Sequence, residues 1–266
     1  MALHAMILRA PQRATATVAA LRPLGFTSTC VQLIHTVWPQ DLAPLEQLVR
    51  RLQAGQYQWL VLTSVNTVQA LASLLDGAQL PATTRIAAVG TKTAQVLREL
   101  LHREADFVPE VQSAAGMLAQ WQLVPGTAVA YPHGDLASPT LAAGLTAWGV
   151  ELDEAIAYST VPAGTAGEPL SSEPVPAGLT VLSPQHLVAA LAETDLVIFA
   201  APSIVREFKA LTGSTLPARV RTLAIGEPTA RALEAAGLPV HATASDPTPA
   251  GLAARAAELF QSHPKK

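Results

Sequence analysis

Short apolar runs alternate with amphipathic segments along almost the whole chain. The run WLVL at 59–62 has the length and composition of a buried strand. The segment 42–54 before it carries leucines and a valine at helical spacing, and a helical pattern follows it to about Leu75. Alternation of this kind predicts an α/β protein with parallel sheets that are flanked by helices.

The same pattern assigns the other elements. Strands are expected at 5–8, 29–37, 59–62, 85–89, 107–108, 127–131, 150–160, 196–199, 220–225 and near Val240. Helices are expected at 12–24, 42–54, after 62 to about 75, 91–101, 113–121, 137–148, 184–193, after 199 to about 211, 227–236 and 248–260. The stretch 162–178 is rich in proline, glycine and serine and predicts a loop or linker.

Two strand-to-helix corners occur twice in the sequence. TSVNTV at 63–68 corresponds to AAPSIV at 200–205, and AAVGTKTAQVL at 87–97 corresponds to LAIGEPTARAL at 223–233. The spacing between the two corners is nearly the same in each half, and the offset is about half the chain. This period is far longer than that of a solenoid, so it predicts two similar α/β lobes.

The first 36 residues have the same pattern as residues 128–160 and look like their equivalent in the other half. LRPLGF and LTAWGV each close a helix with glycine before an extended run. The initial strand and helix therefore fit either lobe.

The four corners are also the candidate binding site. In an open parallel sheet, ligands bind beyond the carboxyl ends of the strands. Helix N-termini there present unpaired N–H groups and a partial positive charge, which favour an anion. Small and hydroxylated residues also cap helices without binding anything, so each corner alone leaves both readings open. A matched pair of corners in both halves favours binding of a ligand with several carboxylates or phosphates.

Composition excludes several classes of function. Hydrophobic residues make up 50% of the 266 positions, charged residues 14%, and the net charge is −3, which gives no electrostatic case for nucleic-acid binding. The single cysteine, Cys30, excludes an internal disulfide and a cysteine cluster, and we interpret it as structural. The apolar start is too short for a signal peptide and no run matches a membrane span, so we expect a cytoplasmic protein without a membrane partner.

Other candidate chemistry is sparse. The seven histidines show no metal-ligand spacing, and no serine lies in a nucleophile elbow, so no metal site is expected. His133 and Asp135 in YPHGD fit a base with its orienting carboxylate, or a simple turn. The sequence shows binding corners without an evident catalytic group.

Several segments carry a resemblance to a known family. They are, in order, ILRAPQ, LVLTSVNTVQAL, AAVGTKTAQVL, ADFVP, AIAYSTVP, LVIFAAPSIVREF, LAIGEPTARALEAAGLPVHATA and DPTPAGLAA. No single segment is diagnostic, but their order and spacing together are specific. By these segments the chain resembles the uroporphyrinogen-III synthase family over nearly its whole length.

The resemblance implies two α/β lobes with a cleft between them, joined by a two-stranded connector. One lobe would be discontinuous, at 1–36 plus 164–266, and the other would span 39–157. The connector strands would be about 34–39 and 157–162.

The resemblance also implies a reaction. The family cyclises hydroxymethylbilane to uroporphyrinogen III in tetrapyrrole (haem) biosynthesis, with loss of water and inversion of the last pyrrole ring. The enzyme would be a lyase of the hydro-lyase type that needs no cofactor. Its partner would be a small-molecule tetrapyrrole with carboxylate side chains, and we expect a monomer.

Site residues follow from the corners and the resemblance together. Tyr158 matches a functionally important tyrosine of the family and is the catalytic candidate, although packing on the connector is the alternative role. The residues expected to bind substrate are Arg9, Thr63, Ser64, Asn66, Gly90, Lys92, Thr93, Ser203, Gly226 and Thr229. The side chains of Arg9 and Lys92 fit a solvated role equally well.

The chain departs from the family pattern at the second-half corners. Ala200 and Ala201 stand where the family often has Thr-Ser before proline, which removes hydroxyl groups. Glu227 adds a negative charge and Pro228 removes an N–H at the last corner. We expect Glu227 to point away from the binding site.

Two other functions remain open at this point. A bilobal anionic-ligand-binding protein without catalysis would use the same corners. A sugar transferase with two α/β lobes is a further alternative, but no glycine-rich phosphate loop is present.

Overall fold

The structure is a computed structural model that describes residues 2–171 and 174–261. The chain divides into two compact units. Unit 1 comprises Met1–His35, Val161–Thr165 and Glu173–Lys266, and unit 2 comprises Thr36–Thr160 and Ala166–Ser172. Residues 1, 172–173 and 262–266 of the predicted lobes lie outside the described residues.

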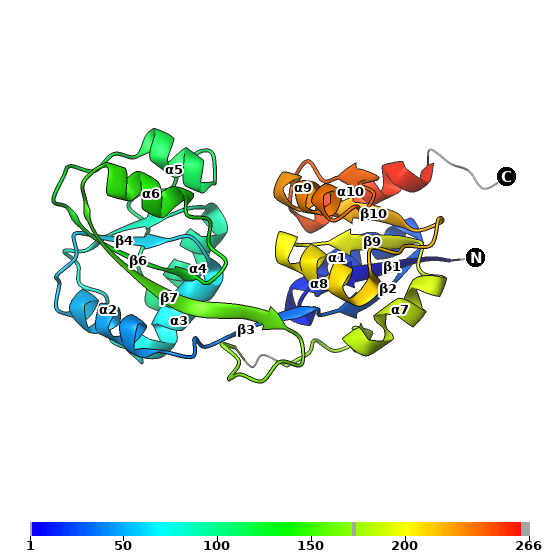
Figure 1. Ribbon diagram of the computed structural model, residues 1–266, viewed down its shortest axis with the longest axis horizontal. Coiled ribbons are helices and arrows are strands. Elements are labelled where there is room, and N and C mark those ends of the chain that lie inside the picture. The colour runs from blue at the N-terminus through cyan, green and yellow to red at the C-terminus, as the bar shows by residue number, and fades with distance from the viewer. Residues whose placement is uncertain (1, 172–173, 262–266) are drawn as a thin grey trace. The chain divides into compact units, whose positions relative to one another are not determined.

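Unit 2 is built on a five-stranded sheet in the order β3-β7-β6-β4-β5 (Figure 1). Its strands are β3 (Ile34–Val37), β4 (Trp59–Leu62), β5 (Arg85–Ala88), β6 (Ala128–Gly134) and β7 (Glu151–Pro162). Its helices are α2 (Ala43–Gln53), α3 (Val65–Leu75), α4 (Thr91–Leu101), α5 (Ala114–Gln120) and α6 (Thr140–Ala147). Leucines of α2 and α3 pack in one apolar core with Leu60 and Leu62, whereas α5 and α6 pack in another with Val61. Alternate residues of a strand point to opposite faces, so the sheet is covered on both sides.

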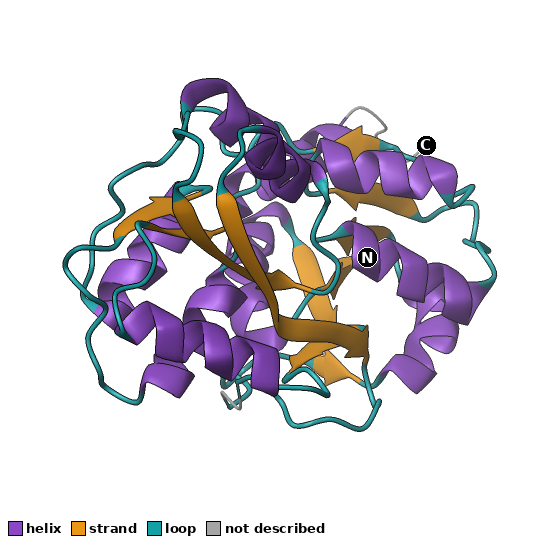
Figure 2. Cartoon of the chain, turned by 60° about the vertical axis from the view of Figure 1, so that its left-hand side comes forward, coloured by secondary structure: helices purple, strands orange, loops and turns teal. Residues whose placement is uncertain are grey.

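Unit 1 is built on a six-stranded sheet in the order β11-β10-β9-β1-β2-β8. Its strands are β1 (Leu3–Leu8), β2 (Phe26–Val31), β8 (Val181–Leu182), β9 (Leu196–Phe199), β10 (Arg221–Ala224) and β11 (Ala242–Thr243). Its α-helices are α1 (Pro11–Leu21), α7 (Leu187–Ala190), α8 (Pro202–Thr212), α9 (Glu227–Ala235) and α10 (Pro249–Gln261), and 3₁₀ turns lie at Arg22–Leu24, Pro184–His186 and Leu191–Glu193. Here too helices flank the strands, as the purple and orange elements of Figure 2 show.

The two sheets repeat one arrangement. The order β10-β9-β1-β2 in unit 1 matches β5-β4-β6-β7 in unit 2. The helices that follow these strands also correspond, α8 with α3 and α9 with α4. The predicted repeat of the corners is therefore confirmed, and the first strand and helix of the chain belong to unit 1 as the partner of β6 and α6.

Parallel pairing brings the corners of each unit to one edge of its sheet. β4 pairs in parallel with β5 and β6, and β6 pairs in parallel with β7. In unit 1, β9 pairs in parallel with β1 and β10. The carboxyl ends of these strands therefore lie together, where ligands bind in open α/β sheets.

Some predicted elements were wrong. The expected strand 29–37 is two strands, because β2 joins the sheet of unit 1 and β3 joins the sheet of unit 2. The expected helix 184–193 is a single turn of α-helix between two 3₁₀ turns.

Three short strands also differ from the expectation. The expected strand at 107–108 is one isolated bridge from Phe107 to Ala87. The strand near Val240 lies at β11, and β8 was not expected. These strands have two residues or fewer, and their pairing partner rather than any local pattern defines them.

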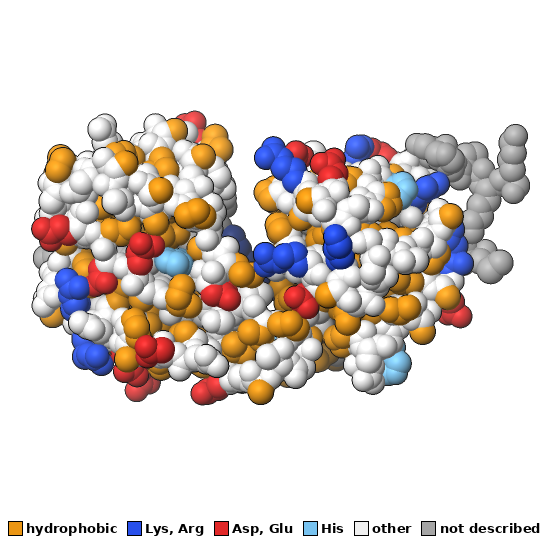
Figure 3. Space-filling model, viewed as in Figure 1, with side chains coloured by type: hydrophobic (Ala, Val, Ile, Leu, Met, Phe, Trp, Pro, Cys, Tyr) orange, Lys and Arg blue, Asp and Glu red, His pale blue; other side chains and the backbone are white. Residues whose placement is uncertain are grey.

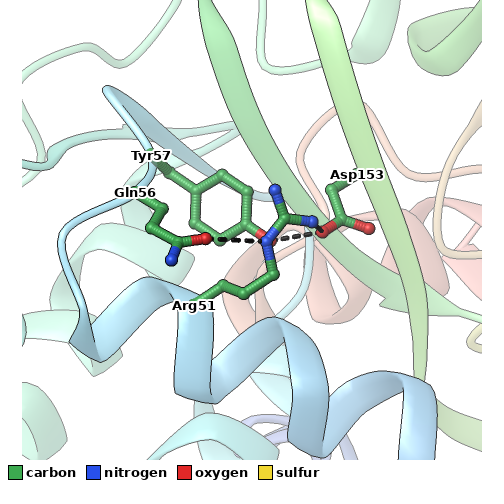
Figure 4. A network of polar contacts seen from close by, with 4 residues as sticks. All are labelled: Arg51, Gln56, Tyr57 and Asp153. Carbon is green, nitrogen blue, oxygen red and sulfur yellow. Dashed lines mark hydrogen bonds and ion pairs between the residues drawn. The ribbon is translucent and has the colours of Figure 1, made fainter.

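A polar network fixes the first part of β7 (Figure 4). The Asp153 carboxylate accepts hydrogen bonds from the Arg51 guanidinium of α2 and from the Tyr57 hydroxyl. Arg51 Nε also donates to Gln56 Oε1 at 3.0 Å, and the guanidinium carbon lies 5.0 Å from the centre of the Tyr57 ring. Burial, followed by the bond to Asp153, raises the pKa of Tyr57 well above its usual value. The network joins α2, the loop after it and the strand that carries Tyr158.

Candidate functional site

A tyrosine–serine pair lies at the carboxyl edge of the unit 2 sheet. The Tyr158 hydroxyl on β7 donates to Ser64 Oγ at 3.0 Å. Ser64 is the N-cap of α3, in extended conformation, and its Oγ also accepts the N–H of Asn66 at 3.1 Å. Ser64 Oγ is the acceptor in both bonds. Its own hydroxyl proton can therefore be donated to a further acceptor.

Tyr131 and Thr63 form a second hydroxyl pair at this edge. Tyr131 on β6 is 2% exposed, and its hydroxyl is hydrogen-bonded to the Thr63 side chain. Burial raises the pKa of Tyr131, and the bond from Thr63 opposes that shift. Sequence reasoning missed Tyr131; its only signal was a polar ring at the end of an otherwise apolar strand.

His133 and Asp135 do not form a catalytic pair. His133 Nε2 lies 3.3 Å from Glu154 Oε1 on the neighbouring strand, and Nδ1 lies 2.9 Å from the carbonyl oxygen of Gly134. Asp135 Oδ1 instead accepts the N–H of Thr160 at 2.9 Å. The alternative reading of Asp135 as part of a turn is the correct one, since it ties the turn after β6 to β7.

The corner at α4 is already partly occupied by the chain itself. Gln112 Oε1 accepts the N–H of Thr91 at 3.0 Å, next to the buried Gly90. Thr93 is 5% exposed, so its side chain faces the interior. Lys92 is exposed and donates to Gln95 at 3.1 Å. Gln112 was not predicted, because a glutamine in a loop carries no sequence signal of this contact.

The corners of unit 1 offer fewer side-chain groups. Ala201 is the N-cap of α8 and forms no side-chain cap bond, and Pro202 has no N–H to give. Ser203 is half-buried. The structure thus leaves backbone N–H groups and one hydroxyl at the start of α8.

The last corner, at α9, begins with Gly226 in extended conformation. Thr229 is 2% exposed and faces the core. Glu227 is exposed and pairs with Arg231 one turn along the helix, at 3.1 Å between Oε1 and Nε. The ion pair partly neutralises the acidic charge at this helix start.

Arg9 follows β1 at the same edge of unit 1. Its N–H donates to the carbonyl of Val31, and its own carbonyl accepts from the Cys30 thiol at 3.0 Å. Burial, and then the nearby charge of Arg13, lowers the pKa of Arg9, because desolvation disfavours the guanidinium cation. Within residues 2–171 and 174–261, neither Arg9 nor Lys92 forms an ion pair. An anion that binds near either residue would therefore meet a positive charge that no carboxylate neutralises.

Cys30 is buried, and burial raises its pKa to about 11, so the thiol stays protonated at neutral pH. This agrees with a structural role.

Charge on the surface is mixed. On the face seen in Figure 3, basic and acidic side chains are distributed among apolar and uncharged ones. An anion near the corners would therefore be attracted by local groups rather than by the total charge.

Neither a metal cluster nor a membrane helix is found in the described part of the chain. Between residues 2 and 171 and between 174 and 261, no three His, Cys, Asp or Glu residues are placed to share a metal ion. The helices of those same ranges are too short or too polar to cross a bilayer.

The family model for uroporphyrinogen-III synthase HemD matches residues 15–254. The chain belongs to this family. A mutant uroporphyrinogen III synthase from the extremely thermophilic bacterium Thermus thermophilus shares its fold with a TM-score of 0.67 at 20% identity, over 98% of this chain and 100% of that one. The uroporphyrinogen-III synthetase from Helicobacter pylori gives a TM-score of 0.53 at 18% identity, over 98% and 99% of the two chains.

The matches confirm the predicted family, the two-lobed α/β fold and the enzyme class, a hydro-lyase of tetrapyrrole biosynthesis. Membership of the family also implies a tetrapyrrole substrate.

Proposed function

We propose that this enzyme closes hydroxymethylbilane to uroporphyrinogen III, and that the Tyr158–Ser64 pair lies where the hydroxyl group departs. The observation that carries the proposal is the 3.0 Å hydrogen bond between these side chains at the carboxyl edge of a parallel sheet, in a chain of this family. The lobes that act together are 1–36 plus 164–266 and 39–157, with connector strands at about 34–39 and 157–162.

The Tyr158 phenol assists the departing oxygen. As the C–O bond of the hydroxymethyl group breaks, its electron pair stays on oxygen and the pyrrole nitrogen stabilises the cation that remains. A hydrogen bond to the developing charge lowers this barrier. The Tyr158 O–H exchanges Ser64 Oγ for the substrate oxygen by rotation about its own C–O bond. Overall, water carries away the hydroxyl group and one proton that the closing pyrroles release.

Positioning accounts for the rest of the catalysis. The substrate is a flexible chain, and closure with inversion requires its two ends to meet in one geometry. Holding reacting groups in that geometry removes most of the entropic barrier. An enzyme with this task needs many anchoring groups and few acid–base groups, which matches the sparse catalytic chemistry of the chain.

The carboxylate arms bind at the helix starts of each unit. In unit 2 the ligands are Thr63, Ser64, Asn66 and the start of α4 at Gly90, with Lys92 as a charge partner. In unit 1 they are Ser203, the backbone at Gly226 and Arg9, whose half-buried cation gains a counter-ion on binding. Thr93 and Thr229 act through the shape of the helix start, because both side chains are buried. All of these groups come from one chain, which fits a monomer.

The decisive experiment is product analysis. Freshly prepared hydroxymethylbilane is incubated with the protein, and the uroporphyrinogens are oxidised and separated as isomers. We expect isomer III as the main product, at a rate proportional to enzyme concentration. Isomer I alone, which forms by spontaneous closure and also appears in the heat-denatured control, would contradict the proposal. Tight binding of the product without turnover would instead favour an anion-binding protein.

A further inference from the structure

A glycine lies directly against the hydroxyl end of the Tyr158 ring. Gly134 ends β6 and pairs with Tyr158 of β7, just after a register shift between His133 and Gly134. A Cβ atom at position 134 would lie 2.5 Å from Cζ of Tyr158, 2.7 Å from its hydroxyl oxygen and 2.8 Å from Cε2. Real Cβ contacts are longer than 3.0 Å, so any side chain here would displace the phenol.

We infer that Gly134 is a positioning residue of the reaction, because the space that it leaves allows the Tyr158 hydroxyl to reach Ser64. The inference rests on the proposed function. It differs from the assignment of Tyr158 itself, since Gly134 touches no substrate and acts only through the ring above it.

Backbone conformation does not require this glycine. The φ angle of Gly134 lies outside the left-handed region, in contrast to glycines such as Gly25 and Gly149. An alanine therefore fits the backbone of the strand, and the three atoms nearest to its added methyl group all belong to Tyr158.

The backbone around the contact is pinned on both sides. The N–H of Asp135 donates to the carbonyl of Tyr158 at 3.1 Å, and the N–H of Thr160 donates to Asp135 Oδ1 at 2.9 Å. The Asp153 network holds β7 farther back along the strand. Because these bonds hold the two strands together, an added methyl group moves the side chain of Tyr158 rather than the strands.

The test is a double-mutant cycle of Gly134→Ala and Tyr158→Phe. For Gly134→Ala alone we expect a loss in kcat of at least about tenfold, similar to that of Tyr158→Phe, because both remove the same general-acid hydrogen bond. With Tyr158→Phe already present, Gly134→Ala should change kcat by about twofold or less, since no hydroxyl group is left to misplace. KM should change less than kcat in each case.

A matched control is Gly144→Ala in α6. A Cβ atom there would lie 2.4 Å from Cδ1 of Leu118, so this variant also introduces a close contact in unit 2. It lies in the helical layer and touches neither Tyr158 nor Ser64. We expect a changed melting temperature but the wild-type kcat and isomer ratio.

Three kinetic outcomes overturn the inference. They are wild-type kcat in Gly134→Ala, an undiminished effect of Gly134→Ala when Tyr158→Phe is present, and a loss of activity in Gly144→Ala of the same size. If Gly134→Ala folds poorly, Gly134→Ala combined with Tyr158→Ala should recover the melting temperature, because the ring that clashes is gone. Absence of that recovery also overturns it. Failure of the proposed function is distinct, because the wild-type protein would then produce no isomer III.

Discussion

The starts of α3 and α8 occupy the same place in their two sheets, yet they carry different chemistry. At α3, Ser64 caps the helix and accepts hydrogen bonds from Asn66 and Tyr158. At α8, Ala201 forms no side-chain cap and Pro202 follows it. The order of strands and helices is therefore the same in both units, whereas the hydroxyl groups at these helix starts lie mainly in unit 2.

The equivalent strands β7 and β2 follow the same trend. β7 of unit 2 brings the Tyr158 hydroxyl to the edge, while its counterpart β2 ends in Cys30 and Val31, which are both fully buried. The two units thus present equivalent helix starts with different side chains beside them. We expect unit 2 to govern turnover and unit 1 to affect mainly substrate affinity.

The largest effect is expected for Tyr158→Phe. The ring and its packing stay, and one hydrogen bond to a charge-developing group is lost, so kcat should fall at least about tenfold, at the low end of general-acid contributions. The melting temperature should fall by only a few degrees, because loss of one partly buried hydrogen bond costs about 1 kcal/mol of unfolding free energy. Steady-state kinetics and thermal denaturation check both. Wild-type turnover would reduce Tyr158 to a packing residue.

Ser64→Ala should affect both stability and rate. It removes the N-cap of α3, which costs about 1 kcal/mol of unfolding free energy. It also removes the acceptor that orients Tyr158, and we expect a roughly threefold loss in kcat, about the value of one weak hydrogen bond. Urea denaturation and isomer-resolved kinetics measure the two effects.

Ser203→Ala is the matched control for Ser64→Ala in unit 1. Ser203 is half-buried and is not the capping residue of its helix. Its substitution should leave stability unchanged and raise KM without a change in kcat. Equal effects of the two substitutions on kcat and KM would contradict the expectation that unit 2 governs turnover and unit 1 governs affinity.

Ala201→Ser should stabilise unit 1. Ala201 already has the extended conformation of an N-cap, with φ −167° and ψ 155°. A serine there can accept an N–H of the first turn, so we expect a gain of about 0.5–1 kcal/mol in unfolding free energy with an unchanged kcat. A gain in kcat toward isomer III would show that the unit 1 corner also takes part in the chemistry.

The smallest effect is expected for Glu227→Gln. Removal of an exposed carboxylate near the proposed binding site for the substrate's carboxylates should lower KM about twofold at low salt, since exposed charge interactions are weak and screened. The difference should vanish near about 1 M salt. Loss of the Arg231 pair and of an acidic group at a helix start predicts slightly lower stability at the same time. A higher KM would place Glu227 in a binding role.

Much of the fold could be predicted from local pattern. Four-residue apolar runs such as Trp59–Leu62 and Leu196–Phe199 are strands in the structure, and the helices after them begin within a residue or two of the expected corners. The repeated corners predicted which strand ends lie together at one edge of each sheet, because parallel pairing brings the carboxyl ends to the same side. The resemblance to the family added Tyr158 and the reaction, which composition and spacing alone did not provide.

Only the tertiary structure decided which side chains meet. Tyr158 and Ser64 are 94 positions apart, and Arg51 and Asp153 are 102 apart, so no local pattern pairs them. The roles of Gln112 and Tyr131 also depend on neighbours from other elements. Gly134 is the clearest case: in sequence it is one more glycine in a turn, and only the strand beside it shows that an aromatic ring fills the space of the missing side chain.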